Sequence, residues 1–247
     1  MASFKRIEQK KWHDLTDLLT TPSVMLHPEQ TIVPIVIVDE FNEPTEFLGT
    51  GSFVGNPPVL ITADHVVKNC TGRLAISLPS GQYPANVIVH RPKSDLALLD
   101  VSGYVCKNPL VLAGNDELTT VKQVVCLEYS TTRPEQAGLH FNPATRLGNV
   151  TRLINETDRY KEAGDEALEL SFPAISGASG APIICLEDYH LWGIVMANVS
   201  YQLLPVQIET TLDEKNQLLQ EVQYYLPQGI AIHVKHLRAF LNEVKNN

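Results

Sequence analysis

Short apolar runs rich in β-branched residues, separated by turn residues, make up the chain from about residue 31 onward. Turn segments such as Asn56-Pro57-Pro58 and Ser80-Gly81 interrupt these runs. Many short strands joined in this way indicate an antiparallel barrel or sandwich. The first six runs predict strands at residues 32–38, 46–54, 59–63, 74–78, 85–89 and 96–101.

A second set of apolar runs follows a connecting segment near residues 103–120. Its strands are expected at residues 123–127, 148–153, 167–170, 182–185, 191–195 and 229–234. Two comparable sets predict an all-β fold of two packed, six-stranded antiparallel barrels. We expect the first barrel at residues 31–110. The second barrel, together with an insertion at residues 199–228 and a C-terminal helix, is expected at residues 111–247.

The two ends of the chain and one internal stretch break the strand pattern. In residues 4–20 apolar positions recur at helical spacing, which predicts a short amphipathic helix within an N-terminal extension, residues 1–30. Residues 234–244 predict a C-terminal helix docked on the second barrel. For the insertion at residues 199–228 we expect a solvated helix and loop, with gating or partner binding as the alternative.

Composition narrows the classes of function. The 247 residues carry a net charge of −9, which disfavours a binder of nucleic acid or anionic membrane. Hydrophobic residues make up 44%, as in ordinary folded proteins, and no apolar stretch approaches the length of a membrane span. The first residues are too charged for the apolar core of a signal peptide, so we expect a cytoplasmic protein.

Cysteine and histidine spacing gives no sign of a metal centre. The four cysteines form no CxxC pair; an even number would permit two disulfides, but we expect four free thiols. Several histidines also lie outside any metal-ligand spacing, so we expect no metal site: His90, His140, His190, His233 and His236.

Candidate chemistry centres on Ser179, in the run Ser176-Gly177-Ala178-Ser179-Gly180-Ala181-Pro182. A serine hydroxyl becomes nucleophilic when a base takes its proton and donors stabilise the resulting oxyanion. Flanking glycines let the backbone turn tightly beside the hydroxyl. Upstream stand His65, at the end of the predicted strand 59–63, and Asp95, just before the predicted strand 96–101. Asp64 and Asp100 compete with Asp95 as the carboxylate.

These segments resemble trypsin-like (chymotrypsin-fold) serine peptidases, and most closely the HtrA/Deg-like branch. The resemblance covers roughly residues 31–241, and the residues after it are too few for the PDZ domain that many members of that branch carry. The matching segments are residues 49–54 with 61–67, 80–87 with 93–99, 176–182, 193–195 and 229–232.

The resemblance implies a role for each residue. Ser179 would be the nucleophile, His65 the general base and then acid, and Asp95 the group that orients the imidazole. The backbone N–H groups of Gly177 and Ser179 would form the oxyanion hole. Ala178 departs from the family, which usually has Asp or Asn at this position. Alanine cannot anchor a newly cut N-terminus, so we do not expect activation by N-terminal clipping. A partner or the substrate could instead order the oxyanion hole.

The resemblance also implies a pocket for the residue before the scissile bond, P1. Its walls would come from Pro173, Ala174 and Ile175 on one side and Met196, Ala197 and Asn198 on the other. No acidic residue stands at its base, so we expect a small or apolar P1 rather than Lys or Arg. The alternative is that these six residues only fill core.

Three functions are compatible with these residues. The first is a serine endopeptidase that cleaves polypeptide through an acyl-enzyme and needs no metal or organic cofactor. The second is a non-catalytic peptide-binding module on a peptidase fold. The third is a regulatory protease that stays silent until an activating protein partner remodels its loops.

Overall fold

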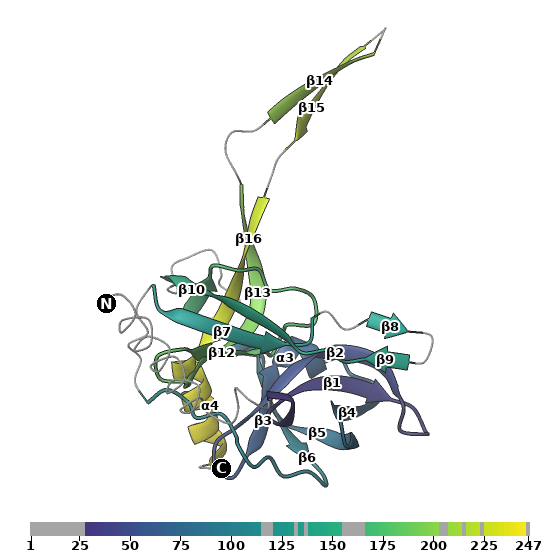
Figure 1. Ribbon diagram of the computed structural model, residues 1–247, viewed down its shortest axis with the longest axis vertical. Coiled ribbons are helices and arrows are strands. Elements are labelled where there is room, and N and C mark those ends of the chain that lie inside the picture. The colour runs from purple at the N-terminus through teal and green to yellow at the C-terminus, as the bar shows by residue number, and fades with distance from the viewer. Residues whose placement is uncertain are drawn as a thin grey trace, which may run out of the picture.

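Two closed antiparallel barrels, each of six strands, form the body of the protein (Figure 1). The computed structural model describes residues 28–114, 121–130, 133–135, 138–154, 166–202, 207–213, 216–222 and 225–245. The two barrels confirm the predicted all-β architecture. The expected N-terminal helix at residues 4–20 lies outside the described residues.

The first barrel has the strand order β1-β2-β3-β6-β5-β4. These strands carry mainly apolar residues, and most of those residues are buried in the core. Ala63 at the end of β3 pairs with Leu96 at the start of β6, so the segments beyond these two residues lie together. The strands are β1 (Ile32–Val38), β2 (Pro44–Val54), β3 (Val59–Ala63), β4 (Arg73–Leu78), β5 (Gly81–Arg91) and β6 (Leu96–Val101).

The second barrel has the order β10-β11-β16-β13-β12-β7. Most of these strands coincide with runs expected from the sequence, but β13 and β16 are much longer than predicted. The strands are β7 (Gln123–Glu128), β10 (Ala144–Ile154), β11 (Ala167–Leu170), β12 (Pro182–Cys185), β13 (Leu191–Gln202) and β16 (Tyr225–His233).

The helix and loop expected over residues 199–228 are wrong for the described part of that stretch. β13 and β16 continue to pair as far as Gln202 opposite Tyr225, and β14 (Gln207–Asp213) pairs with β15 (Asn216–Val222). Figure 1 shows this ribbon projecting from the second barrel. The apolar spacing in this stretch suits either structure, and strand pairing, which is not local, decides between them.

A second small hairpin and four short or terminal helical segments complete the described fold. The hairpin consists of β8 (Arg133–Glu135) and β9 (Gly138–His140). The helical segments are η1 (Pro28–Gln30), α3 (Asp64–Val67), η2 (Pro92–Ser94) and α4 (Val234–Lys245).

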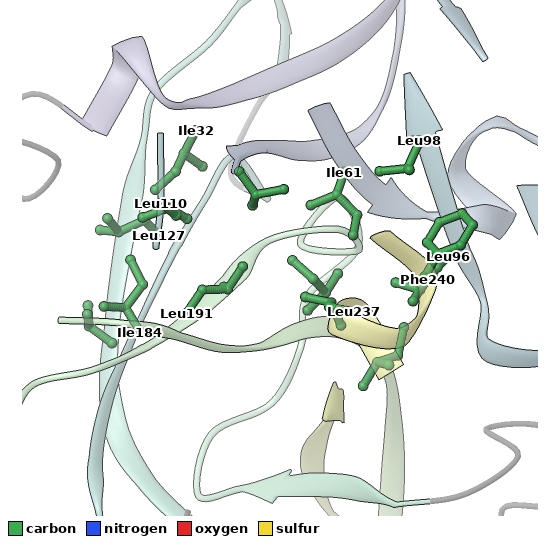
Figure 2. Close-up of a cluster of buried hydrophobic side chains, with 14 of the residues drawn as sticks. Ile32, Ile61, Leu96, Leu98, Leu110, Leu127, Ile184, Leu191, Leu237 and Phe240 are labelled. Atoms are coloured by element: carbon green, nitrogen blue, oxygen red, sulfur yellow. The ribbon is translucent and has the colours of Figure 1, made fainter. Parts of the chain in front are cut away.

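The C-terminal helix α4 packs on β13 and β16 of the second barrel, as expected, and it also contacts the first barrel. Leu237 and Phe240 belong to a buried cluster that includes Leu96 of the first barrel and Leu191 of the second (Figure 2). The Arg91 guanidinium lies 5.8 Å from the centre of the Phe240 ring. Burial of a side chain of this size stabilises the fold by roughly 1.5–3 kcal/mol, so α4 helps to hold the barrels together.

All four cysteines are free, and three of them are buried. Burial raises the pKa of the Cys106, Cys126 and Cys185 thiols. Over the described residues, no set of three His, Cys, Asp or Glu side chains could hold a metal ion. In the same part of the chain, no helix has the length and apolar character needed to cross a bilayer.

Candidate active site

His65 lies on α3, a single helical turn that follows β3 directly. Val66 and Val67 on this turn are buried in the core of the first barrel, whereas His65 is exposed. The apolar pair therefore fixes the turn and leaves the imidazole at the surface.

Asp95 meets His65 because β3 and β6 are neighbours. One carboxylate oxygen, Oδ2, lies 2.7 Å from Nδ1 of His65, and the other, Oδ1, accepts the His65 backbone N–H at 2.9 Å. The backbone of Asp95 is left-handed, with φ of 48°, a conformation that aspartate tolerates better than most residues. Both carboxylate oxygens are thus aimed at one residue.

This contact determines the tautomer of the imidazole. An ionised carboxylate only accepts hydrogen bonds, so we assign the proton of neutral His65 to Nδ1, which leaves the lone pair of Nε2 available. The competing carboxylates lie elsewhere. Asp64 is buried and contacts His90 Nδ1 at 2.6 Å, and Asp100 is exposed near the far end of β6.

Strands of both barrels hold the loop that carries Ser179. The Ser179 carbonyl accepts the Thr50 N–H from β2 at 2.9 Å, and the Gly180 N–H donates to Val195 of β13 at 2.8 Å. A Cβ atom on Gly49 would lie 3.0 Å from both the Ser179 carbonyl oxygen and a methyl of Val66, the neighbour of His65. The serine and histidine segments therefore pack against the same glycine.

The structure brings His65 and Asp95 into direct contact, and the Ser179 backbone lies beside the helical turn that carries His65. Among the hydrogen bonds described, none joins the Ser179 hydroxyl to the His65 imidazole. The proton transfer between these two groups is therefore part of the proposal below.

Thr50 is a buried residue of this site that the sequence reasoning missed. Its hydroxyl donates to the Gly177 carbonyl at 3.0 Å and accepts the Tyr129 N–H at 3.3 Å. Its own carbonyl accepts the Thr62 hydroxyl at 2.8 Å. Thr50 thus joins the first barrel to the serine loop, and its only signal in the sequence is a hydroxyl residue between Gly49 and Gly51.

Residues 175–178 form a tight turn before Ser179. The Ala178 N–H donates to the Ile175 carbonyl at 2.8 Å, and Gly177 has φ of 93°, as a type II turn requires at its third position. A Cβ on Gly177 would lie 2.4 Å from the Phe47 ring, so this position needs glycine for both space and conformation. The Ala178 side chain is buried among apolar neighbours, which leaves no acidic group at this position.

Asn198 joins the two predicted walls of the P1 pocket. Its side-chain Oδ1 accepts the Ala174 N–H at 2.7 Å, and its Nδ2 donates to the Ala174 carbonyl. Pro173, Ala174, Met196 and Ala197 are half-buried, and Ile175 is exposed. Of the six predicted pocket residues, the structure thus joins Ala174 and Asn198 by hydrogen bonds.

Gly229 lies beside these walls and was missed in the sequence as a site residue. Its N–H donates to the Phe172 carbonyl at 2.7 Å, and it pairs with Asn198 across β13 and β16. A Cβ there would lie 2.8 Å from the Phe172 carbonyl oxygen and 3.3 Å from the Ala174 nitrogen. The close approach of these backbones explains the glycine.

The chain matches the trypsin-like peptidase domain family over residues 49–194, more than half of its length, and therefore belongs to that family. The uncharacterized protein y4bJ of Sinorhizobium fredii is 30% identical over 139 residues, covering 55% of this chain and 20% of that protein. The chain thus spans about one fifth of that relative.

Solved structures of proteases share the fold. The Rv3671c protease from M. tuberculosis, in its active form, superposes with a TM-score of 0.57 at 19% identity, covering 87% of this chain and 81% of that chain. The HtrA-type protease AlgW with a decapeptide has a TM-score of 0.59 at 14% identity, covering 89% and 65%. At these identities the likeness shows the fold alone.

Proposed function

We propose that Ser179, His65 and Asp95 carry out peptide-bond hydrolysis as one catalytic unit. The observation that carries this proposal is the double contact of the Asp95 carboxylate with His65, through the imidazole and the backbone N–H. It supports the tautomer that a general base needs, with the proton on Nδ1 and the lone pair on Nε2.

The reaction proceeds in two halves. Nε2 of His65 takes the hydroxyl proton as Oγ of Ser179 bonds to the substrate carbonyl carbon, and then gives that proton to the departing amine as the C–N bond breaks. Water then attacks the acyl-enzyme, its proton passes to His65, and the proton returns to Ser179 as the acid product leaves. Asp95 stays ionised and stabilises the imidazolium.

The backbone around Ser179 supports the proposed oxyanion hole. The N–H groups of Ala178 and Gly180 donate to Ile175 and Val195. Among the described residues, the N–H groups of Gly177 and Ser179 are donors in no main-chain bond outside the strands. They can therefore serve the oxyanion, and loss of one such donor costs roughly 3 kcal/mol in comparable enzymes.

We further propose that P1 is small or apolar. The Asn198 side-chain amide crosses from one wall to the other and bonds to the Ala174 backbone through both the amide oxygen and the amide nitrogen. This bridge makes the pocket between the walls smaller. The six proposed lining residues carry no charge that would pair with Lys or Arg. Cleavage of a peptide library mainly after Lys or Arg would contradict this part of the proposal.

A fluorophosphonate probe tests the catalytic unit. We expect the wild-type protein to be labelled, Ser179→Ala to be unlabelled and His65→Ala to be labelled far more slowly. Ser176→Ala is the matched control, because Ser176 is an exposed serine in the same loop, and it should label like the wild type. Labelling of Ser179→Ala at the wild-type rate would refute the assignment.

Ala178 favours the partner-activated protease as a second candidate. Family members with an acidic residue at this position can anchor it by charge, whereas here an alanine is packed in apolar core. Labelling that begins only when a protein partner is added would select this candidate. Absence of labelling under every condition would select the non-catalytic peptide-binding module.

A further inference from the structure

A cavity of about 390 Å³ lies beside the helical turn that carries His65. Val67 of that turn and Lys68, which follows it, form part of the lining. The rest comes from the segment that joins α3 to β4, from β5, and from the ends of β1 and β4, including Val38 and Leu74. Cavities that hold small molecules in proteins measure roughly 300–1,000 Å³. The volume therefore suits a small organic molecule rather than a polypeptide segment.

The lining of this cavity is basic, although the protein as a whole is acidic. Lys68, Arg73 and His90 belong to the lining, and among its described residues none is Asp or Glu. The chain has a net charge of −9. A concave site lined by one sign of charge concentrates ions of the opposite sign. Asn42 and Asn86 add neutral amide donors, so the cavity favours an anionic ligand.

Arg73 is held in place by a hydrogen bond that does not neutralise its charge. One guanidinium nitrogen donates to the main-chain carbonyl of Asp39 at 2.7 Å. The Asp39 carboxylate instead accepts the backbone N–H groups of Phe41 and Glu43, at 2.9 and 2.8 Å. A guanidinium has five N–H donors, so Arg73 retains others for a ligand in the cavity.

His90 connects the cavity to the turn that carries His65. Nδ1 of His90 lies 2.6 Å from Oδ1 of Asp64, whose side chain is only 4% exposed. Asp64 is the first residue of α3 and directly precedes His65, and its carbonyl accepts the Lys68 N–H at 2.9 Å. The lining of the cavity therefore contacts this turn at both ends, through His90 at one end and Lys68 at the other.

We propose that this cavity binds a small organic phosphate and that the bound phosphate acts as an effector of peptide-bond hydrolysis. A phosphate monoester carries a charge of roughly −1.5 to −2 near pH 7, which the cations of Lys68 and Arg73 match. Both cations give charge-assisted hydrogen bonds to its oxygens, and the organic part packs on the apolar walls. Such a ligand links α3 to β4 and so stabilises the turn that positions His65. The effector role rests on the proposed function of His65, whereas the binding does not.

Calorimetric titration of the full chain with phenyl phosphate, inorganic phosphate and phenol tests the two halves of the ligand separately. We expect phenyl phosphate to bind with a Kd at least tenfold below that of phenol, because phenol lacks the charge-assisted bonds. Inorganic phosphate lacks the apolar part and should bind roughly fivefold more weakly than phenyl phosphate. No measurable binding of phenyl phosphate, or a Kd no lower than that of phenol, would overturn the proposal.

A double variant locates the binding site. Lys68→Gln with Arg73→Gln removes both cations from exposed positions and should raise the Kd of phenyl phosphate about tenfold or more. Lys107→Gln with Lys245→Gln is the matched control, because it changes the net charge equally at exposed positions outside this cavity. The control should change Kd less than twofold. An equal loss of affinity in both double variants would mean that overall charge attracts the ligand, and would overturn the site.

The effector role is tested by the rate of fluorophosphonate labelling at saturating phenyl phosphate. We expect the ligand to speed labelling of the wild type at least twofold and to leave the rate of the Lys68→Gln, Arg73→Gln variant unchanged, because binding energy spent on one conformation of the turn shifts the population toward it. Binding without a faster rate would overturn the effector role. Absence of labelling under every condition would count against the catalytic unit, and the effector role with it, whereas the titrations would still decide whether the cavity binds an organic phosphate.

Discussion

Thr50 positions the loop that carries the nucleophile, and its replacement by valine isolates this role. Valine keeps the β-branched shape in a residue that is fully buried, but it removes the hydroxyl that bonds to Gly177 and Tyr129. Two buried main-chain groups then lose a partner, which should lower the free energy of unfolding by about 1–3 kcal/mol.

The effect on labelling follows from the same bonds. The Gly177 carbonyl belongs to the same residue as one of the proposed oxyanion N–H groups, and without the Thr50 hydroxyl this carbonyl loses the bond that ties it to the first barrel. If the free energy that favours the ordered turn falls by about 1–2 kcal/mol, the fluorophosphonate labelling rate should fall roughly 5- to 30-fold. Thr50→Ser retains the hydroxyl and should restore most of that rate.

Thr62→Val is the control for general destabilisation. The Thr62 hydroxyl bonds to the Thr50 carbonyl and makes no described bond to the serine loop. We expect it to lower stability by a similar amount and to slow labelling much less than Thr50→Val. If the two variants lose stability equally and both label at the wild-type rate, Thr50 has only a structural role and the reasoning fails.

Three further predictions follow from the site and the core. Asp95→Asn should reduce the labelling rate by about 10⁴-fold with an unchanged circular dichroism spectrum, because the asparagine amide would favour the wrong imidazole tautomer; a drop below tenfold would contradict the assignment. Asn198→Gly should extend P1 preference in a peptide library to larger apolar residues, and an unchanged profile would mean that the amide does not limit the pocket. Maleimide at neutral pH should modify Cys70 first, and peptide mapping would identify the modified residue. Burial raises the pKa of the other three thiols, those of Cys106, Cys126 and Cys185, and so lowers their thiolate fraction.

Local pattern in the sequence was enough to predict the twelve barrel strands, because a short run of β-branched and apolar residues between turn residues is a property of each segment by itself. It was also enough to select His65 and Asp95, since His65 follows the predicted strand at residues 59–63 and Asp95 directly precedes the one at 96–101. That these two strands are neighbours in the barrel brings the residues into contact.

Contacts between distant segments could not be predicted in this way. The Thr50 hydroxyl bonds to a residue 127 positions away, and nothing in the local sequence marks such a partner. The bridge from Asn198 to Ala174 crosses 24 positions and depends on the barrel being closed. The ribbon between Val199 and Gln228 was misjudged for the same reason, because the pairing of β13 with β16 is not encoded in either segment alone.

The central claim is that Ser179 forms a covalent acyl intermediate. We would mix the protein with a p-nitrophenyl ester of an acylated alanine, quench with acid within the first turnover, and locate the acyl group by peptide mapping. The account predicts a single acyl group on Ser179 that accumulates with a burst of p-nitrophenol and is absent from Ser179→Ala. An acyl group on a different residue, or product formation with no acyl group on the protein, would contradict it.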